Sequence, residues 1–293
     1  MRRFPFAIAP LILSVIGMTP VLGQSEATVP AAAMPADTSS DDAFRVTTPW
    51  TIRIEPMLWY PGLRGDISFA GGGDSDFNKI DVEDIDLDEN ELTFGVSADI
   101  RAEPWSFHFE GFLFSADDDG VAERALNAGP LPIPAGTPLD FDLDFGAFEA
   151  TVGHRIYESV FDRADGDDVA LIFDAYGGIR MYDVDLTLET AGGTVRNDDE
   201  WLEPILGVRM TMLLPKGFGI DLNTDFGAWG GNDRSSSSWN IEVGMHWAPH
   251  DNVELQIGFR HLSVDLREGS GDFDEFIFDN SLAGLYGGIV IRF

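Results

Sequence analysis

The sequence predicts an all-β fold, a closed antiparallel up-and-down transmembrane β-barrel of about ten strands, with eight or twelve as neighbouring counts. Ten segments alternate apolar and polar side chains, as strands do when one face lies in lipid. Short and long connections between the segments follow the barrel pattern. No apolar run after residue 23 is long enough to span a bilayer as a helix, and in lipid only helices and closed barrels satisfy their backbone polar groups.

The N-terminal residues are typical of a secretory signal. Met1-Arg2-Arg3 gives a positive start, an apolar core covers 6–22, and Val21-Leu22-Gly23 offers a small-residue cleavage site. We therefore expect a signal peptide over 1–23. Residues 24–48 are rich in Ala, Pro, Ser, Thr and Asp and lack apolar periodicity, which predicts a disordered periplasmic tail. The rest, 49–293, is expected to be one barrel domain.

Four strands are predicted in the first half of this domain. They cover about 50–69, about 91–102, 105–115 and about 139–156. In the second, Phe94 and Val96 face away from Ser97 and Asp99, because successive side chains point to opposite faces. In the fourth, the apolar parity slips near Gly146-Ala147. One extra residue in a strand produces such a slip, so we expect a β-bulge there.

Six further strands complete the predicted barrel. They cover about 169–188, about 201–214, 218–229, about 239–247, about 253–267 and about 276–293. Tight turns are expected after the second, sixth and eighth strands, and a moderate connection after the fourth. Intermediate polar loops are expected after the fifth, seventh and ninth, and long loops over roughly 70–90 and 116–138. Short turns on the periplasmic side place both termini in the periplasm.

The closing strand resembles that of a known family. Counting back from Phe293, Ile291 and Ile289 share an apolar face, while Arg292 and Gly288 share the other. This resembles Gram-negative outer-membrane β-barrel proteins of the small monomeric type, which typically end on Phe as an assembly signal. The resemblance implies an outer-membrane location, contact with outer-membrane lipid and lipopolysaccharide, insertion by the barrel-assembly machinery, and a monomer. It implies no catalytic residues.

Aromatic residues near the predicted strand ends indicate girdles at the two membrane surfaces. They are Trp50, Trp105, Trp201, Trp239, Trp247, Phe218 and Phe293. The alternative is that these tryptophans pack in the core of a β-sandwich. We prefer the girdle because the alternation holds across so many strands.

Charged residues on the non-lipid parity form the candidate site, a charge cluster in the lumen. Its members are Arg53, Glu55, Asp99, Arg101, Glu110, Asp174, Arg180, Glu203, Arg209, Asp221, Asp225, Glu242, Glu254, Arg260 and Arg292. A small barrel has an interior that side chains can fill, and arginine pairs bidentately with carboxylates. The cluster is either a salt-bridged plug, which we favour, or a gated pore. Because carboxylates outnumber arginines, such a pore would prefer cations.

The formal net charge of −33, with Lys79 and Lys216 as the only lysines, argues against nucleic-acid binding, which needs a basic footprint. The first long loop is acidic, with Asp74, Asp76, Asp81, Glu83, Asp84, Asp86, Asp88, Glu89 and Glu91, and Asp117-Asp118-Asp119 forms a second acidic tip. Carboxylates are ligands of Ca²⁺ and Mg²⁺, so weak binding of these ions at the extracellular loops is possible in principle. We prefer a solvated loop, and we expect no other cofactor.

The function expected from the sequence is non-catalytic: a structural or surface barrel, or a narrow cation-preferring channel. One alternative is a barrel enzyme, a protease or lipid hydrolase with residues at the rim. Of the five histidines, only His261, with Asp265 four residues later, is placed near the outer rim. A second alternative is a soluble periplasmic β-barrel that binds a small lipophilic ligand.

Overall fold

The computed structural model describes residues 50–72, 78–85, 87, 89–161, 168–231, 233–269 and 275–293. The predicted signal peptide and tail, 1–23 and 24–48, lie outside the described residues. The long strands are β1 (Thr51–Ser68), β3 (Thr93–Ala102), β4 (Trp105–Val121), β7 (Pro138–Phe161), β8 (Val169–Thr190), β9 (Gly193–Leu213), β10 (Phe218–Gly230), β11 (Arg234–His250), β12 (Val253–Glu268) and β13 (Phe276–Arg292). The short elements are β2 (Ile80–Asp81), η2 (Val82–Ile85), β5 (Leu126–Ala128), β6 (Leu131–Ile133) and η3 (Pro215–Gly217). Within the described part of the chain, no helix is long and apolar enough to cross a membrane.

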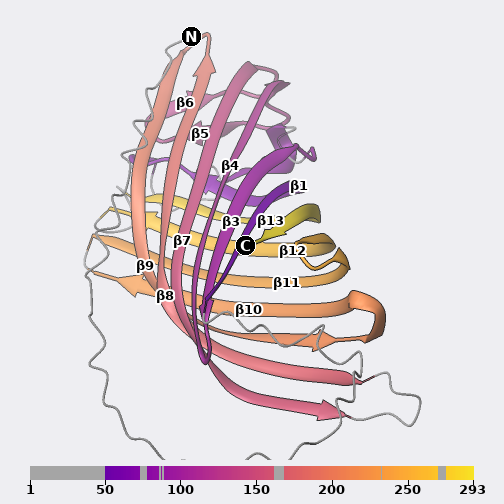
Figure 1. Ribbon diagram of the computed structural model, residues 1–293. Helices are drawn as coiled ribbons and strands as arrows, with labels where there is room; N and C mark the ends of the chain where they lie inside the picture. The colour runs from indigo at the N-terminus through magenta and orange to yellow at the C-terminus, as the bar shows by residue number, and fades with distance from the viewer. Residues whose placement is uncertain are drawn as a thin grey trace, which may run out of the picture. The chain divides into compact units, whose positions relative to one another are not determined.

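The long strands form one closed antiparallel ring. Each pairs with its neighbours in sequence order, and β13 pairs with β1 from Arg53↔Arg292 to Ser68↔Ile277. Figure 1 shows β1 beside β13 where the ring closes. Closure leaves neither terminal strand as a free sheet edge. The predicted fold class and the count of ten strands are confirmed.

Two connections are shorter than predicted. The β8 and β9 strands stay paired up to Thr190↔Gly193, and residues 231–233 alone join β10 to β11. The sequence predicts intermediate polar loops at both places, and residues 193–200 show no apolar alternation. In the structure, Arg196 and Asp198 on this part of β9 are exposed. A strand with no strongly buried face pairs through its backbone without leaving a hydrophobic signal in the sequence.

A band of exposed apolar side chains faces outward on all ten long strands. Its most exposed members include Leu206, at 74%, and Leu285, at 63%. Each strand contributes at least two such residues, for example Ile52 and Ile54, Phe94 and Val96, Phe107 and Phe109, Phe148 and Val152, Ile179 and Met181, Leu202 and Leu206, Phe218 and Phe226, Val243 and Met245, Leu255 and Ile257, and Leu285 and Ile289. An outward apolar band of this kind is the lipid-facing surface of a transmembrane barrel.

The inner and outer faces of the wall exchange their character partway along the strands. On β7, Phe145 and Glu149 are both buried inside, whereas Asp144 and Phe148 are both exposed outside. Pairing of β7 with β4 and β8 continues without a shift through Gly146, so the predicted bulge is wrong. The alternation is unbroken. The apolar residues change face because the surroundings of the wall change from lipid to water.

This exchange divides the ring into two halves. The lipid-facing half carries the apolar band outside and polar groups inside. The water-facing half carries polar groups outside and apolar groups inside, over residues 61–68, 114–121, 138–147, 182–190, 193–201, 262–268 and 276–282. The long connections leave from the water-facing half. The tight turns lie at the opposite end, called here the short-turn end, where Phe293 N donates to Ile52 O at 2.9 Å.

An aromatic core fills the water-facing half. Phe145 stacks on Phe278 at 5.6 Å and on Tyr182 at 5.8 Å between ring centroids. Side chains from the long connections pack into the same core: Ile80, Val82, Ile85, Leu87, Ala122, Leu126, Ala128 and Ile133. The preference for a fully solvated first long loop is therefore wrong. Its apolar residues are buried in the mouth of the barrel.

The aromatic residues of the predicted girdle separate into two groups. Trp50, Trp105, Trp239, Trp247, Phe218 and Phe293 are exposed on the outside. Trp201 is not part of a girdle, because it is 2% exposed, stacks on Phe276 and donates from Nε1 to Arg267 O at 3.2 Å. It lies in the water-facing half, where an inward-facing apolar residue enters the core.

Placing arginine at Leu206, in the middle of the lipid band, is expected to destabilise the barrel by about 2–4 kcal/mol, because the charge would enter hydrocarbon. The matched control is Asp144→Arg, on the outer surface of the water-facing half. This change is expected to alter stability by less than about 1 kcal/mol. Urea unfolding in phospholipid vesicles would measure both. Equal losses for the two variants would contradict the assignment of the two halves.

Candidate functional site: the charged lumen

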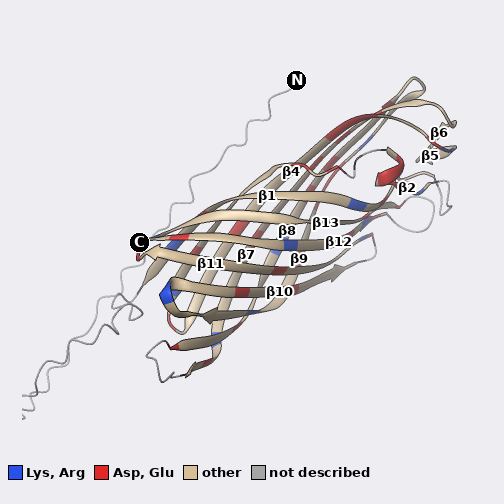
Figure 2. Ribbon diagram, turned by 90° about the vertical axis from the view of Figure 1, so that its right-hand side faces the viewer, with Lys and Arg blue, Asp and Glu red and all other residues tan. Residues whose placement is uncertain are grey.

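The interior of the lipid-facing half is polar. All members of the predicted lumen cluster lie at inward-facing positions of the ring, where they are buried or half-buried. Figure 2 shows acidic and basic residues spaced along the strands of the barrel. Because side chains alternate along a strand, the residues directly before and after each inward charge face outward, toward lipid.

Arg180 lies at the centre of this interior and is 1% exposed. Its Nε and Nη2 donate to Glu149 Oε2 at 3.1 and 2.5 Å, and Nη2 also donates to Asp225 Oδ1 at 2.8 Å. Nη1 donates to Ser238 Oγ at 3.1 Å. One guanidinium thus joins three other strands, β7, β10 and β11. Such a buried triad has a low energy only while every charge in it keeps its partner.

Neutral side chains complete the hydrogen bonds of the central carboxylates. Asp225 Oδ2 accepts from Asn240 Nδ2 at 2.9 Å and from Tyr176 Oη at 3.2 Å. Glu203, which is fully buried, accepts from Tyr182 Oη at 3.0 Å and from Ser238 Oγ. These donors satisfy Asp225 Oδ2 and Glu203 Oε1, while Glu203 Oε2 has no hydrogen-bond partner among the described residues.

Arg260 connects the polar interior to the aromatic core. It forms an ion pair with Glu110, and its Nε donates to Asn240 Oδ1 at 3.1 Å. Its guanidinium carbon also lies 5.3 Å from the ring centroids of both Trp59 and Phe112. A cation over two aromatic faces is attracted by both rings. The boundary between the two halves of the interior is therefore closed by a cation–π contact.

Glu254 gathers charges at the short-turn end. This carboxylate is fully buried and accepts from Arg53 Nη2 at 2.9 Å and from Arg292 Nη2. Arg53 and Arg292 are directly opposite each other across the seam between β1 and β13. Glu254 on β12 thus holds the two strands that close the ring.

Two histidines pair with carboxylates in the same region. His108 Nδ1 lies 3.2 Å from Asp99 Oδ1, which also accepts from Arg209 Nη1 at 3.4 Å. His246 Nδ1 lies 2.5 Å from Asp221 Oδ2, and Asp221 Oδ1 accepts from Thr211 Oγ1 at 2.7 Å. Both carboxylates are therefore held by more than one strand.

Four members of the predicted cluster take little or no part in these networks. Asp174 lies 3.7 Å from Arg155 Nε, a long ion pair. Glu55 lies against Gly288, where a Cβ atom would come within 2.5 Å of its Oε1. Glu242 is opposite Arg260 in the β11–β12 register. Arg101 has no hydrogen bond or ion pair within the described part of the chain.

Several lumen residues were missing from the sequence prediction. They are His108, Glu149, Arg155, Tyr176, Tyr182, Ser238, Asn240 and His246. Parity could have identified Glu149, His108 and His246, which share the face of the predicted charges. The tyrosines and Asn240 carry no formal charge, and a search confined to charged side chains passes over them.

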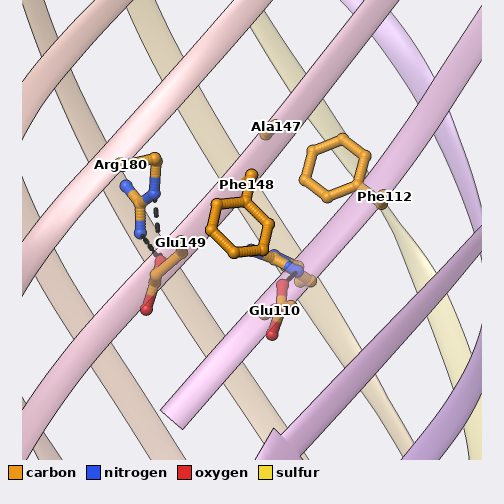
Figure 3. Close-up of a pocket in the computed structure, with 7 residues that line it drawn as sticks. Glu110, Phe112, Ala147, Phe148, Glu149 and Arg180 are labelled. Atoms are coloured by element: carbon orange, nitrogen blue, oxygen red, sulfur yellow. Dashed lines mark hydrogen bonds and ion pairs between the residues drawn. The ribbon is translucent and has the colours of Figure 1, made fainter. Parts of the chain in front are cut away.

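A small cavity lies between the two arginine networks. It has a volume of about 10 Å³ and is lined by Glu110, Phe112, Ala147, Phe148, Glu149, Arg180 and Arg260. Figure 3 shows Arg180 joined to Glu149 beside it, with Phe112 on the aromatic side. A space of this size holds about one water molecule, so the two networks are nearly in contact.

The acidic first loop is partly described. Asp74, Asp76, Asp86 and Asp88 lie outside the described residues. Of the others, Glu83 pairs with Arg64, and Asp84 accepts from Arg124 Nε at 3.0 Å. Among described residues, no group of three or more His, Asp or Glu side chains could hold a metal ion. Weak cation binding by these loops stays a prediction.

The predicted rim pair does not form a dyad with a shared hydrogen bond. His261 lies on the outside of β12, with its ring 5.6 Å from that of Trp239. Asp265 accepts from Arg267 Nε at 2.8 Å and Nη2 at 3.0 Å. The carboxylate is thus held by an arginine on its own strand.

An acidic surface covers the outside of the water-facing half. Across β4, β7, β8 and β9, the register places Asp117 opposite Asp142, Asp144 opposite Asp185, and Asp185 opposite Asp198. Burial and then the neighbouring carboxylates of Asp144 and Asp117 raise the pKa of Asp142. Like charges in direct register repel, so this wall is electrostatically unfavourable in isolation.

The chain matches no protein-family model and no curated protein sequence. Solved structures with similarity to it include the outer membrane protease OmpT from Escherichia coli, with 8% identity over 86% of this chain and 100% of that one, and a TM-score of 0.40. The attachment invasion locus protein Ail of Yersinia pestis has 10% identity over 84% and 100%, with a TM-score of 0.31. Neisserial surface protein A has 12% identity over 84% and 98%, with a TM-score of 0.31. The strand pairing of this chain, which closes from β13 to β1, shows its fold directly.

Proposed function

We propose that this chain is an outer-membrane β-barrel of the structural or surface type whose interior is closed to solutes. The observation that carries the proposal is the aromatic core of the water-facing half. Phe145, Tyr182 and Phe278 stack across the interior and are at most 1% exposed. Close-packed aromatic rings leave no hydrated path for an ion.

The charged lumen then acts as a structural plug. Arg180, Arg260 and Glu254 each join strands that are not neighbours in the ring or that meet at its seam. Hydrogen-bonded ion pairs of this kind hold the opposite walls of the barrel at a fixed distance. This arrangement favours the plug over the narrow cation-preferring channel.

The proposed setting is the Gram-negative outer membrane, with lipid and lipopolysaccharide around the apolar band. We place the short-turn end, with both ends of the ring, in the periplasm, and the long connections outside the cell. Insertion by the barrel-assembly machinery and a monomeric state are part of the proposal.

Single-channel recording of the refolded barrel in a planar bilayer tests the closed interior. We expect no reproducible conductance steps from the wild-type protein, because the aromatic core closes the water-facing half. Refolding is checked by the shift in gel mobility on heating. Cation-selective steps that change in Arg209→Ala or Glu203→Ala would overturn the plug and favour the channel.

Two further assays separate this proposal from the other classes. Finding the protein soluble in the periplasm after fractionation would favour a soluble barrel and contradict the lipid role of the outward band. The proposal also expects no hydrolysis of peptide or phospholipid substrates. Hydrolysis lost in His261→Ala would favour a barrel enzyme instead.

A further inference from the structure

The short-turn end of the lumen contains an arginine, Arg101, that has no hydrogen-bond or ion-pair partner among the described residues. Arg101 is half-buried, its Nε is buried, and it makes no hydrogen bond or ion pair within the residues that the structure describes. It lies opposite Thr51 on β1 and opposite Ser106 on β4, so a hydroxyl group flanks it on each side. Buried guanidinium donors in proteins are normally satisfied by acceptors.

Other arginines lie close to Arg101. Arg53 is directly opposite Asp99 in the β1–β3 register, which makes it the diagonal neighbour of Arg101 on the same face. Arg209 reaches Asp99 from the opposite wall, at 3.4 Å. The three arginines therefore surround one carboxylate.

Three carboxylates in this region, Glu254, Asp99 and Asp221, are already held by other groups. Glu254 is shared by Arg53 and Arg292, and Asp99 is shared by Arg209 and His108. Asp221 is held by His246 and Thr211, and Asp174 lies near Arg155. The buried Nε atoms of Arg53, Arg101, Arg155 and Arg292 also have no acceptor. Several guanidinium donors at this end thus have no acceptor within the described residues.

The Ser106 hydroxyl packs against a glycine on the neighbouring strand. Gly153 faces it across the β4–β7 ladder, and a Cβ atom at Gly153 would lie 2.5 Å from Ser106 Oγ. The lack of a side chain at Gly153 thus leaves room for the Ser106 hydroxyl itself. Arginine forks and hydroxyl donors that approach from several strands match an anion with several oxygens better than a single carboxylate.

We infer that the short-turn end of the lumen binds a phosphate-class oxyanion through Arg101, with Arg53, Arg209 and the hydroxyls of Thr51 and Ser106 around it. The anion gives Arg101 the acceptor that it does not find among the described residues. The same chemistry is offered by free phosphate and by the headgroup of an anionic phospholipid. This inference is independent of whether the barrel conducts.

The first test uses the refolded full-length barrel in non-ionic detergent, titrated with inorganic phosphate in a calorimeter at low chloride. We expect saturable binding that Arg101→Gln weakens at least about ten-fold, because a charge-assisted bidentate contact is lost. The control is Arg267→Gln, which removes an arginine of the water-facing half and leaves binding unchanged. Arg101→Lys keeps the charge without the fork and should give intermediate affinity.

A second arm identifies the source of the anion. The wild-type barrel and the Arg101→Gln variant are placed in bilayers of phosphatidylcholine alone or with phosphatidylglycerol, and thermal unfolding is compared. A phosphatidylglycerol-dependent rise in melting temperature that Arg101→Gln removes assigns the site to a lipid headgroup. Phosphate binding without that rise assigns it to a free anion. No binding in either arm, or binding equal in the folded Arg101→Gln variant, would overturn the inference.

Discussion

Replacing Arg180 by methionine is expected to destabilise the barrel by about 3–5 kcal/mol, the cost of breaking a buried ion network by removing one partner. The change leaves Glu149 and Asp225 buried together, at 7% and 3% exposure, without their cation. Their carboxylates would then repel each other in a medium that cannot solvate them. Urea unfolding in phospholipid vesicles, followed by tryptophan fluorescence, would measure the shift in the midpoint.

Two controls show whether the loss arises from uncompensated charge. Arg196→Met removes an exposed arginine that pairs with Asp185 and Asp198, and should cost less than about 1 kcal/mol. Adding Glu149→Gln and Asp225→Asn to Arg180→Met should recover part of the stability, because no charge then stays unpaired. If the triple variant is no more stable than the single one, the network does not act through charge balance.

Phe145→Ala is expected to cost about 3–5 kcal/mol, the range for removing a buried aromatic side chain. Phe145 is 1% exposed and contacts Phe112, Tyr182 and Phe278, with ring centroids 5.6 to 6.0 Å apart. Its removal deletes the ring that links the β4, β8 and β13 sides of the core. The same unfolding assay would record the loss.

The matched control for Phe145→Ala is Phe161→Ala on the same strand. Phe161 is half exposed at the short-turn end, so its loss should change stability by less than about 1 kcal/mol. Similar losses for the two variants would mean that the water-facing half is not held by its aromatic core, and would remove the main support for a closed interior.

The strands were predictable because each contains a stretch with a strong apolar contrast between its faces. The β12 and β13 strands began and ended within a residue or two of their predicted bounds. The start of β9 was missed because residues 193–200 have no strongly buried face. The expected bulge at Gly146 was wrong for a related reason. The slip of parity was assigned to the backbone, whereas the backbone is regular at Gly146 and its surroundings change there.

The candidate site was predictable as a set of positions but not as a set of contacts. Parity places Arg180, Glu149 and Asp225 on the inside of the ring, yet nothing in the sequence pairs them. Arg53 meets Glu254 across 201 residues, and Arg209 meets Asp99 across 110. The curvature and closure of the ring bring such partners together across the lumen, and the order of residues along one strand does not show this.

The sequence by itself determined that this chain forms ten alternating strands with a charged inner face, because alternation records which side chains share a face. Only the tertiary structure decided what each face meets. It placed Trp201 in the core, packed the apolar residues of the first loop into the mouth, and left Arg101 without a partner among the described residues. The physical reason is that a period of two specifies the orientation of a side chain relative to its strand, whereas lipid, water or an opposing wall is set by where the closed ring lies.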